Sequence, residues 1–246
     1  MLDTQKIALV TGANKGIGKH VAHQLAQRGV FVLVGSRDLA RGAATVDEFT
    51  GEGLASRVVT LDVTSDASVA AAVADVDLGP ARLDILVNNA GITSGLDSVA
   101  TMSVDDVRRT YETNVFGVVR ATNAFLPLLR QSSAPRIVNV SSGLGSLSMM
   151  SDPNFAFADL NNGAYQSSKA ALNALTILYA KELRAEGFKI NAVSPGYRAT
   201  DLNGGLPTPG ARDAAGGAEV AVRMALLPDD GPTGEFHSDS GRVLPW

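Results

Sequence analysis

The sequence predicts an α/β protein, built as a doubly wound parallel sheet of about seven strands with helices on both faces. Short apolar runs alternate with longer, Ala-rich stretches of helical period. The runs are apolar throughout, which is typical of strands buried on both faces of a parallel sheet. The alternation implies right-handed βαβ units. Because no linker-like composition divides the chain, we expect a single domain over residues 1–246.

Strands are expected where an apolar run is bounded by turn residues, and helices where apolar residues recur every three or four positions. The expected strands are residues 7–10, 30–34, 57–61, 85–87, 136–140, 189–193 and 234–237. The expected helices are residues 16–27, 39–49, 67–76, 104–129, 164–186 and 214–227.

Two segments break this alternation. Residues 146–163 follow a strand but do not begin a regular helix, and residues 197–213 are rich in glycine and proline. Long loops in compact domains are commonly functional. We therefore expect a lid-like insertion at 146–163 and a substrate loop at 197–213. The alternative for the insertion is that Met149, Phe155 and Phe157 only pack it onto the core.

Composition narrows the class of protein. The net charge of −4 argues against a nucleic-acid partner, because such proteins usually carry a basic face. The absence of cysteine removes disulfides and thiolate chemistry, and with three histidines a zinc or other metal site is not expected. The N-terminus lacks the pattern of a signal peptide, and the longest apolar runs are too short to cross a bilayer. We expect a cytoplasmic protein with no membrane partner.

The stretch TGANKGIGKH, residues 11–20, places three glycines between the first strand and the first helix. A turn without side chains exposes backbone N–H groups, and the helix that follows adds the positive end of its dipole, so the turn can bind phosphate. An ordinary glycine-rich turn is the alternative. The residues expected at the phosphates are Gly12, Asn14, Lys15, Gly16, Ile17 and Gly18.

The end of the second strand, VGSRD at residues 34–38, indicates the cofactor. A carboxylate here would bind the ribose of NAD, whereas a nearby arginine accommodates the 2′-phosphate of NADP. Ser36 stands at the acid position and Arg37 follows it. Lys15 is a second cation that can reach the same phosphate. We expect NADP(H) in preference to NAD(H), although Asp38 would favour NAD if the register shifted by two residues.

Tyr165 and Lys169 stand four residues apart in a helical stretch, so both can face one ligand. A tyrosine ordinarily titrates at about pH 10. A neighbouring ammonium and an oxidised nicotinamide both favour the phenolate, which lowers the tyrosine pKa and makes a general acid or base. The alternative is a packed tyrosine and a solvated lysine. The other three tyrosines have no lysine four residues on.

Hydroxyl and amide groups complete the candidate site. Ser141 and Ser142 end the fifth strand, and the carboxyl ends of such strands face the ligand crevice. A hydroxyl there can bind a carbonyl oxygen. Asn114 lies inside the helical stretch 104–129, although asparagine is a poor helix former. It is either a tolerated defect or a break in the helix that holds a water or a lysine.

Taken in order, these motifs resemble those of the short-chain dehydrogenase/reductase family over nearly the whole chain. The resemblance implies a Rossmann-like fold, with Tyr165 as the proton donor and Ser142, rather than Ser141, orienting the carbonyl oxygen. It implies that Lys169 binds the ribose and lowers the pKa of Tyr165, and that Asn114 anchors a proton-relay water. It also implies cofactor contacts by Asp62 and Val63 at the adenine, by Asn89, Ala90 and Gly91 in the ribose region, and by Pro195, Gly196 and Thr200 at the nicotinamide.

Within the family, the glycine turn, Ser36-Arg37 and the stretch GPTGEF at 231–236 resemble NADPH-dependent carbonyl reductases. That implies hydride transfer to a ketone or aldehyde. A catalytically idle NADP-binding sensor and an NAD-linked alcohol dehydrogenase are the alternatives, and monomer or homo-oligomer is left open. Arg198 could meet an acidic group of the substrate, but we expect an apolar small molecule, bound by Ser142, Met149, Phe155 and Leu202.

Overall fold

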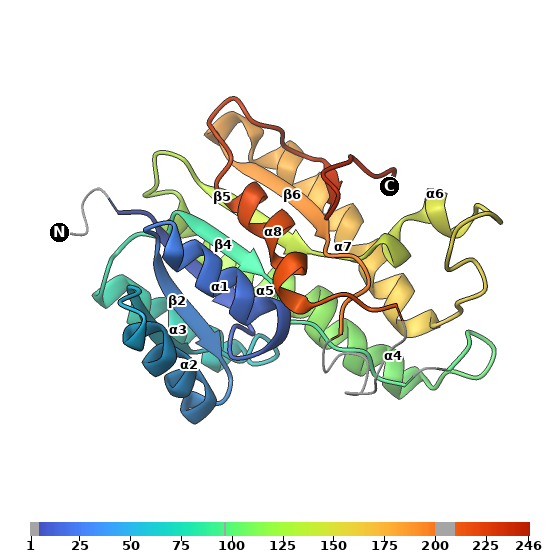
Figure 1. Cartoon of the computed structure of the whole chain (residues 1–246), viewed down its shortest axis with the longest axis horizontal. Coiled ribbons are helices and arrows are strands. Elements are labelled where there is room, and N and C mark those ends of the chain that lie inside the picture. Colours follow the sequence, from blue (N-terminus) through green and yellow to red (C-terminus); the bar gives the residue numbers. More distant parts are fainter. Residues whose placement is uncertain (1–4, 96, 200–209) are drawn as a thin grey trace.

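The computed structural model describes residues 5–95, 97–199 and 210–246. It confirms the predicted class: seven parallel strands form one sheet in the order β3-β2-β1-β4-β5-β6-β7 (Figure 1). The strands are β1 Ile7–Thr11, β2 Phe31–Ser36, β3 Ser56–Thr60, β4 Ile85–Asn88, β5 Arg136–Val140, β6 Lys189–Ser194 and β7 Phe236–Ser238.

The helices that connect the strands mostly begin at a side-chain cap. An N-cap oxygen satisfies a backbone N–H that has no partner within the helix, and Asp38, Ser65, Ser103, Asn162 and Asp213 each do so. The helices are α1 Gly16–Gln27, α2 Leu39–Gly51, α3 Asp66–Leu78, α4 Val104–Tyr111, α5 Gly117–Leu129, α6 Leu147–Met150, α7 Gly163–Glu182 and α8 Ala214–Ala225.

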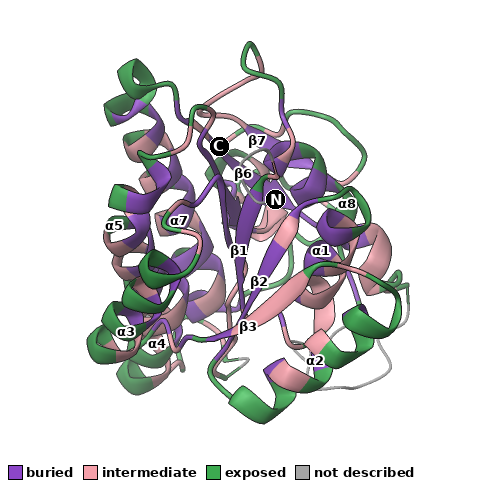
Figure 2. Ribbon diagram, turned by 90° about the vertical axis from the view of Figure 1, so that its left-hand side faces the viewer, coloured by how far each residue is buried: buried purple, intermediate pink, exposed green. Residues whose placement is uncertain are grey.

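The sheet separates two hydrophobic cores, one on each face (Figure 2). Along β1 the side chains alternate: Ala8 and Val10 join the core that includes residues of α1 and α8, while Ile7 and Leu9 join the core that includes residues of α3, α5 and α7. Successive strand side chains point to opposite faces, so a strand covered on both sides must be apolar at every position. This explains the unbroken apolar runs in the sequence.

The strand order places the ligand crevice. Chain order reverses between β1 and β4, which are neighbours in the sheet. In open α/β sheets, ligands bind outside the carboxyl ends of the strands at such a switch point. The glycine turn after β1, the Asn-Asn-Ala-Gly segment after β4 and the Ser-Ser-Gly segment after β5 therefore meet at one edge.

Three elements differ from the sequence predictions. The stretch 104–129 is not one helix, because a π-helical turn, Glu112–Phe116 (η1), separates α4 from α5. The helix expected to reach residue 186 ends at Glu182 and is followed by a 3-10 turn, Arg184–Glu186 (η3). The insertion 146–163 contains a short helix, α6, where none was expected; Ser146 caps it by accepting from the Met149 N–H at 3.1 Å.

Within the described ranges, no helix combines the length and the apolarity that a membrane span requires.

Gly18 supports a test of the glycine turn. A Cβ at this position would lie 2.3 Å from Asn89 Nδ2 and 2.6 Å from the Gly12 carbonyl oxygen, so Gly18→Ala forces the turn and α1 apart. We expect it to lower the free energy of unfolding by about 1–3 kcal/mol in urea denaturation. The matched control is Gly51→Ala, where the new Cβ meets nothing within 4 Å. Equal stability of the two variants would contradict this account.

Candidate active site

Tyr165 lies in the first turn of α7, and the cap of that helix fixes its place. Asn162 accepts a hydrogen bond from the Tyr165 N–H at 3.2 Å and donates to Thr93 Oγ1 at 3.1 Å. One buried amide thus joins the start of α7 to the segment that follows β4. The Ser142 hydroxyl is close enough to the Tyr165 phenol to lower its pKa through hydrogen bonding. The two groups expected to face a carbonyl oxygen therefore lie side by side.

The two serines at the end of β5 have different surroundings. Ser141 is buried and donates to Asn173 Oδ1 at 2.6 Å, so its hydroxyl holds β5 to α7. Ser142 is only partly buried, accepts from the Leu144 N–H at 3.2 Å and lies beside the Tyr165 phenol. Of the two, Ser142 is the one placed beside the tyrosine.

Lys169 lies behind Tyr165 and is only 4% exposed. Its Nζ donates to the Val140 carbonyl at 2.8 Å and lies 5.7 Å from the centroid of the Tyr165 ring. A Cβ added at Gly91 would lie 3.5 Å from Lys169 Nζ and 3.4 Å from Asn114 Oδ1. The lysine and the asparagine therefore both border Gly91.

Burial shifts the two titratable groups in opposite directions. Burial raises the pKa of Tyr165 to about 12, and the Ser142 hydrogen bond offsets only part of this. Burial lowers the pKa of Lys169 to about 8. The sequence led us to expect a lowered tyrosine pKa. The structure gives the opposite direction among the protein's own groups, because desolvation disfavours the phenolate. At neutral pH Tyr165 keeps its proton and Lys169 is mostly charged.

Asn114 lies in the π-helical turn, and its side-chain amide forms two hydrogen bonds with the backbone of Ile92, in the segment after β4. Its Oδ1 accepts from the Ile92 N–H at 2.9 Å, and its Nδ2 donates to the Ile92 carbonyl at 2.9 Å and to Ser168 Oγ at 3.0 Å. Asn114 therefore stands at a break in the regular helix, and its side chain bonds Ile92 and Ser168 rather than Lys169. The side chain joins the irregular helix to the backbone beside Gly91.

The glycine turn has the geometry of a backbone cradle. Gly12 and Gly16 have φ values of +64° and +55°, which favour glycine, and α1 begins at Gly16 without a side-chain cap from Lys15. The N–H groups of the first helical turn have no partner within the helix, and with the helix dipole they suit phosphate. Asn14 and Ile17 lie in the same turn and are partly buried.

Asn89 and Ala90 hold the glycine turn in place. The Asn89 amide donates to the Thr11 carbonyl at 2.9 Å, and the N–H groups of Asn89 and Ala90 donate to Thr11 Oγ1 at 3.0 and 2.9 Å. The resemblance assigned Asn89 to the ribose region. In the structure its side chain also holds the glycine turn. Thr11, which anchors all three bonds, was not among the predicted site residues.

The end of β2 has no carboxylate available at the predicted acid position. Ser36 is buried and donates to the Asp38 carbonyl at 2.7 Å. The Asp38 carboxylate caps α2 by accepting from the Arg41 N–H at 3.1 Å, and it also pairs with the Arg41 side chain. Arg37 is exposed. The edge of the crevice at this strand therefore carries a cation, and the carboxylate that follows it is engaged in capping.

Asp62 and Val63 follow β3 along the same edge. Burial opposes ionisation of Asp62, but hydrogen bonds from Thr64 and the charges of Arg37 and Arg120 outweigh it and hold the carboxyl pKa below its usual value. Val63 is buried, and its carbonyl accepts from Arg120 Nη1 at 2.6 Å.

Apolar and aromatic side chains come together from the insertion and from the segment after β6. Met149 Cε would lie 3.5 Å from a Cβ at Gly143, next to Ser142. The rings of Phe155 and Phe157 are 5.6 Å apart, and Phe157 lies 5.8 Å from Tyr197, which follows Pro195 and Gly196. The insertion and the segment after β6 therefore touch. Thr200 and Leu202, predicted at the nicotinamide and the substrate, lie outside the described residues.

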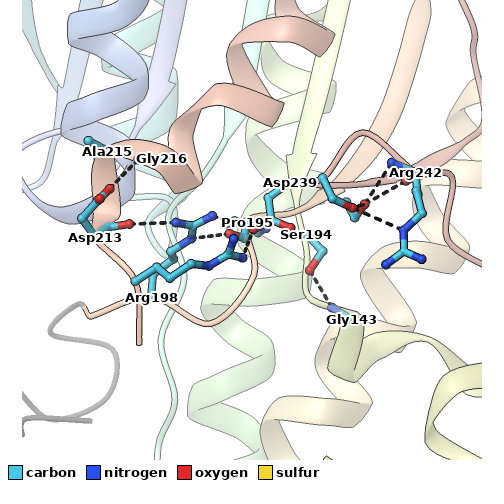
Figure 3. A network of polar contacts seen from close by, with 12 residues as sticks. Gly143, Ser194, Pro195, Arg198, Asp213, Ala215, Gly216, Asp239 and Arg242 are labelled. Carbon is cyan, nitrogen blue, oxygen red and sulfur yellow. Dashed lines mark hydrogen bonds and ion pairs between the residues drawn. The ribbon is translucent and has the colours of Figure 1, made fainter. Parts of the chain in front are cut away.

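Arg198 does not have the role that we considered for it. It is buried, and its guanidinium pairs with Asp239 at 2.6 Å rather than presenting a cation to an acidic substrate (Figure 3). Over the described ranges, no group of three or more metal-ligating side chains is placed to hold an ion.

A buried amide pair lies beneath the site and was not predicted. Asn88 and Asn139 are opposite each other in the register of β4 and β5, and Asn88 Nδ2 donates to Asn139 Oδ1 at 2.9 Å. Asn88 also donates to Thr122 of α5, and Asn139 to Thr176 of α7. Asparagine at the carboxyl end of each strand was the signal in the sequence.

The buried lysine makes stability depend on pH. Above pH 8 folded Lys169 releases its proton, while the unfolded chain keeps it up to about pH 10.5, so folding gains stability as pH rises through this window. Above pH 10 the raised pKa of Tyr165 acts in the opposite direction. Urea denaturation of wild type and Lys169→Met from pH 7 to 10 isolates the lysine. Methionine does not titrate, so we expect the free energy of unfolding of Lys169→Met, taken relative to wild type, to fall by about 1 kcal/mol per pH unit between pH 8 and 10. A constant difference would contradict the lowered pKa.

Comparison with known proteins identifies the family. The model of the short chain dehydrogenase family matches residues 6–209. (−)-Isopiperitenone reductase of Mentha piperita is 34% identical, with 96% of this chain and 97% of the relative covered. Carbonyl reductase (NADPH) 1 of Sus scrofa is 33% identical, with coverage of 100% and 96%.

Solved structures support the same family assignment. The NADPH-bound carbonyl reductase from chicken fatty liver superposes with a TM-score of 0.86 at 29% identity, covering 98% of this chain and 99% of that one. Salutaridine reductase from Papaver somniferum gives a TM-score of 0.80 at 30% identity, with coverage of 94% and 99%. The sheet order, the glycine turn and the Ser142, Tyr165 and Lys169 arrangement are thus accounted for together: the chain belongs to the short-chain dehydrogenase/reductase family of oxidoreductases.

Proposed function

We propose that this protein is an NADPH-dependent carbonyl reductase that reduces a ketone or aldehyde to an alcohol, with Tyr165 as the general acid. The observation that carries this proposal is the placement of Ser142 beside Tyr165, with the Nζ of buried Lys169 5.7 Å from the centroid of the tyrosine ring. Two hydroxyls and one ammonium converge where the carboxyl ends of β4, β5 and β6 meet.

The residues of the site suit the proton side of the reaction. Tyr165, protonated at neutral pH, donates its proton to the carbonyl oxygen, and Ser142 orients that oxygen by hydrogen bonding. Lys169 then stabilises the phenolate that remains, because an adjacent ammonium favours it. The nicotinamide, when bound, supplies the hydride.

The residues around the crevice fit NADPH. Gly12, Gly16 and Gly18 leave room for the backbone to approach a pyrophosphate, and a Cβ at Gly18 would strike Asn89. Exposed Arg37 directly follows β2, where NAD-type sites place a carboxylate. Exposed Lys15 belongs to the glycine turn, whose Ala13 N–H donates to the Gly35 carbonyl of β2 at 2.9 Å. The engagement of Asp38 in capping α2 weighs against an NAD-linked dehydrogenase. The names of the relatives, which include a carbonyl reductase described as NADPH-dependent, support the same cofactor.

An apolar substrate suits the described walls. Met149, Phe155 and Phe157 come from the insertion, and we propose that this segment borders the bound substrate with Tyr197 across from it. Thioether and aromatic side chains adapt to varied apolar shapes. Two relatives are named as reductases, (−)-isopiperitenone reductase and salutaridine reductase, which supports a reductase role for this protein.

Replacement of Tyr165 tests the acid. We expect Tyr165→Phe to lower kcat by about 10²–10⁴-fold in NADPH-dependent reduction of a ketone panel, since the proton donor is lost. The NADPH dissociation constant, followed by cofactor fluorescence, should stay within about threefold. Tyr179→Phe is the matched control on the same helix, because its hydroxyl bonds Asn123 away from the site. Retained turnover in Tyr165→Phe would show that another group delivers the proton.

Charge reversal at Arg37 tests the cofactor preference. We expect Arg37→Asp to weaken NADPH binding by about 10- to 100-fold and NADH binding far less, because a charge-assisted bond to the 2′-phosphate is lost. Arg28→Asp makes the same charge change at the C-terminal end of α1, the end away from the glycine turn. This control should leave the dissociation constants of NADPH and NADH near those of wild type. Equal losses for both cofactors would point to Lys15 or to a site with no 2′-phosphate contact.

A further inference from the structure

A buried ion pair lies beneath the turn that follows β6. Arg198 Nη2 lies 2.6 Å from Asp239 Oδ2, with the two side chains only 5% and 12% exposed. Buried ion pairs add little net stability, because desolvation offsets much of the attraction. Such a pair is better explained by the geometry that it imposes on the groups around it.

Arg198 holds three segments of backbone and side chain together. Its Nε donates to the Pro195 carbonyl at 2.6 Å and its Nη1 to the Asp213 carbonyl at 3.1 Å, while Nη2 meets Asp239 (Figure 3). The planar guanidinium presents these donors in a fixed fork, which a lysine ammonium does not. The neighbouring backbone of α8 is close, since a Cβ at Gly217 would lie 3.1 Å from the arginine.

Asp239 anchors the other side of the same turn. Its N–H donates to the Ser194 carbonyl at 3.0 Å, and its carboxylate also bonds Arg212. Gly196 has a φ of +76°, and a Cβ there would lie 2.5 Å from Asp239 Oδ2. The carboxylate is therefore pressed against the Pro195-Gly196 turn, and only glycine fits.

The network continues to the catalytic serine. Ser194 Oγ accepts from the Gly143 N–H at 3.0 Å, and Gly143 directly follows Ser142 (Figure 3). A path of contacts thus leads from Arg198 and Asp239, through the end of β6, to the residue whose hydroxyl lies beside Tyr165. Each step is a hydrogen bond or a peptide bond.

We infer that Arg198 and Asp239 form a positioning pair that fixes the end of β6 and, through the Ser194–Gly143 bond, holds Ser142 in line with Tyr165. This inference rests on the proposed function in one respect: Ser142 must orient the carbonyl oxygen. Neither member of the pair is assigned contact with the substrate.

The first test needs neither cofactor nor substrate. In Arg198→Lys and Asp239→Asn, we expect the Gly143 N–H, followed by NMR hydrogen exchange, to exchange at least tenfold faster than in wild type. Arg57→Lys is the control, because the Arg57–Asp75 pair joins β3 to α3 at the far edge of the sheet. If either variant fails to fold, Arg198→Met with Asp239→Leu removes the pair without leaving a buried charge. Unchanged exchange at Gly143 would overturn the inference.

The second test separates positioning from general loosening of the structure. We expect Arg198→Lys to lower kcat about tenfold in wild type but less than twofold in a Ser142→Ala background, because the pair acts through that serine. A merely structural role predicts the same loss in both backgrounds, and that result would overturn the inference. Absence of reductase activity in wild type would refute the proposed function, and the Gly143 exchange rates would still decide the contact path.

Discussion

The site depends on one close contact, between the turn after β5 and helix α7. A Cβ at Gly145 would lie 2.6 Å from the Lys169 backbone carbon, so the turn and the helix touch backbone to backbone. Asn173 donates to the Gly145 carbonyl at 3.0 Å, and Ser141 bonds the same asparagine. This contact sets the distance between the end of β5 and α7. Ser142, Tyr165 and Lys169 meet because the two backbones are this close.

The same packing determines the chemistry of the two titratable groups. Enclosure penalises charge, so the pKa of Tyr165 rises and that of Lys169 falls. Tyrosine is thereby kept as a proton donor, while lysine remains mostly charged at neutral pH. A more open site would leave both groups nearer their ordinary values. The electrostatics of the site therefore follow from its packing.

Side-chain amides, of which those of Asn114 and Asn162 are buried, support the walls of the crevice. Asn89 holds the glycine turn, Asn114 holds the segment beside Gly91, and Asn162 joins that segment to the start of α7. Each side-chain amide bonds a backbone group or a hydroxyl. Without the amide, these polar groups would need a water as partner, and leaving them unpaired would cost free energy. The Arg198 network adds the fourth side, at β6. Few residues are proposed to take part in the reaction, and many of the polar side chains around them hold backbone segments in place.

The sequence by itself determined the sheet, the helices that cover it and the candidate catalytic residues, because these depend on local periodicity and short spacings. Tyr165 and Lys169 share a helix face by their spacing alone, and the glycine turn follows from three residues within seven. Only the tertiary structure decided that Asn89 supports the turn and that Arg198 is buried against Asp239. Their partners, Thr11 and Asp239, lie 78 and 41 residues away along the chain, and no local pattern specifies which distant groups will meet.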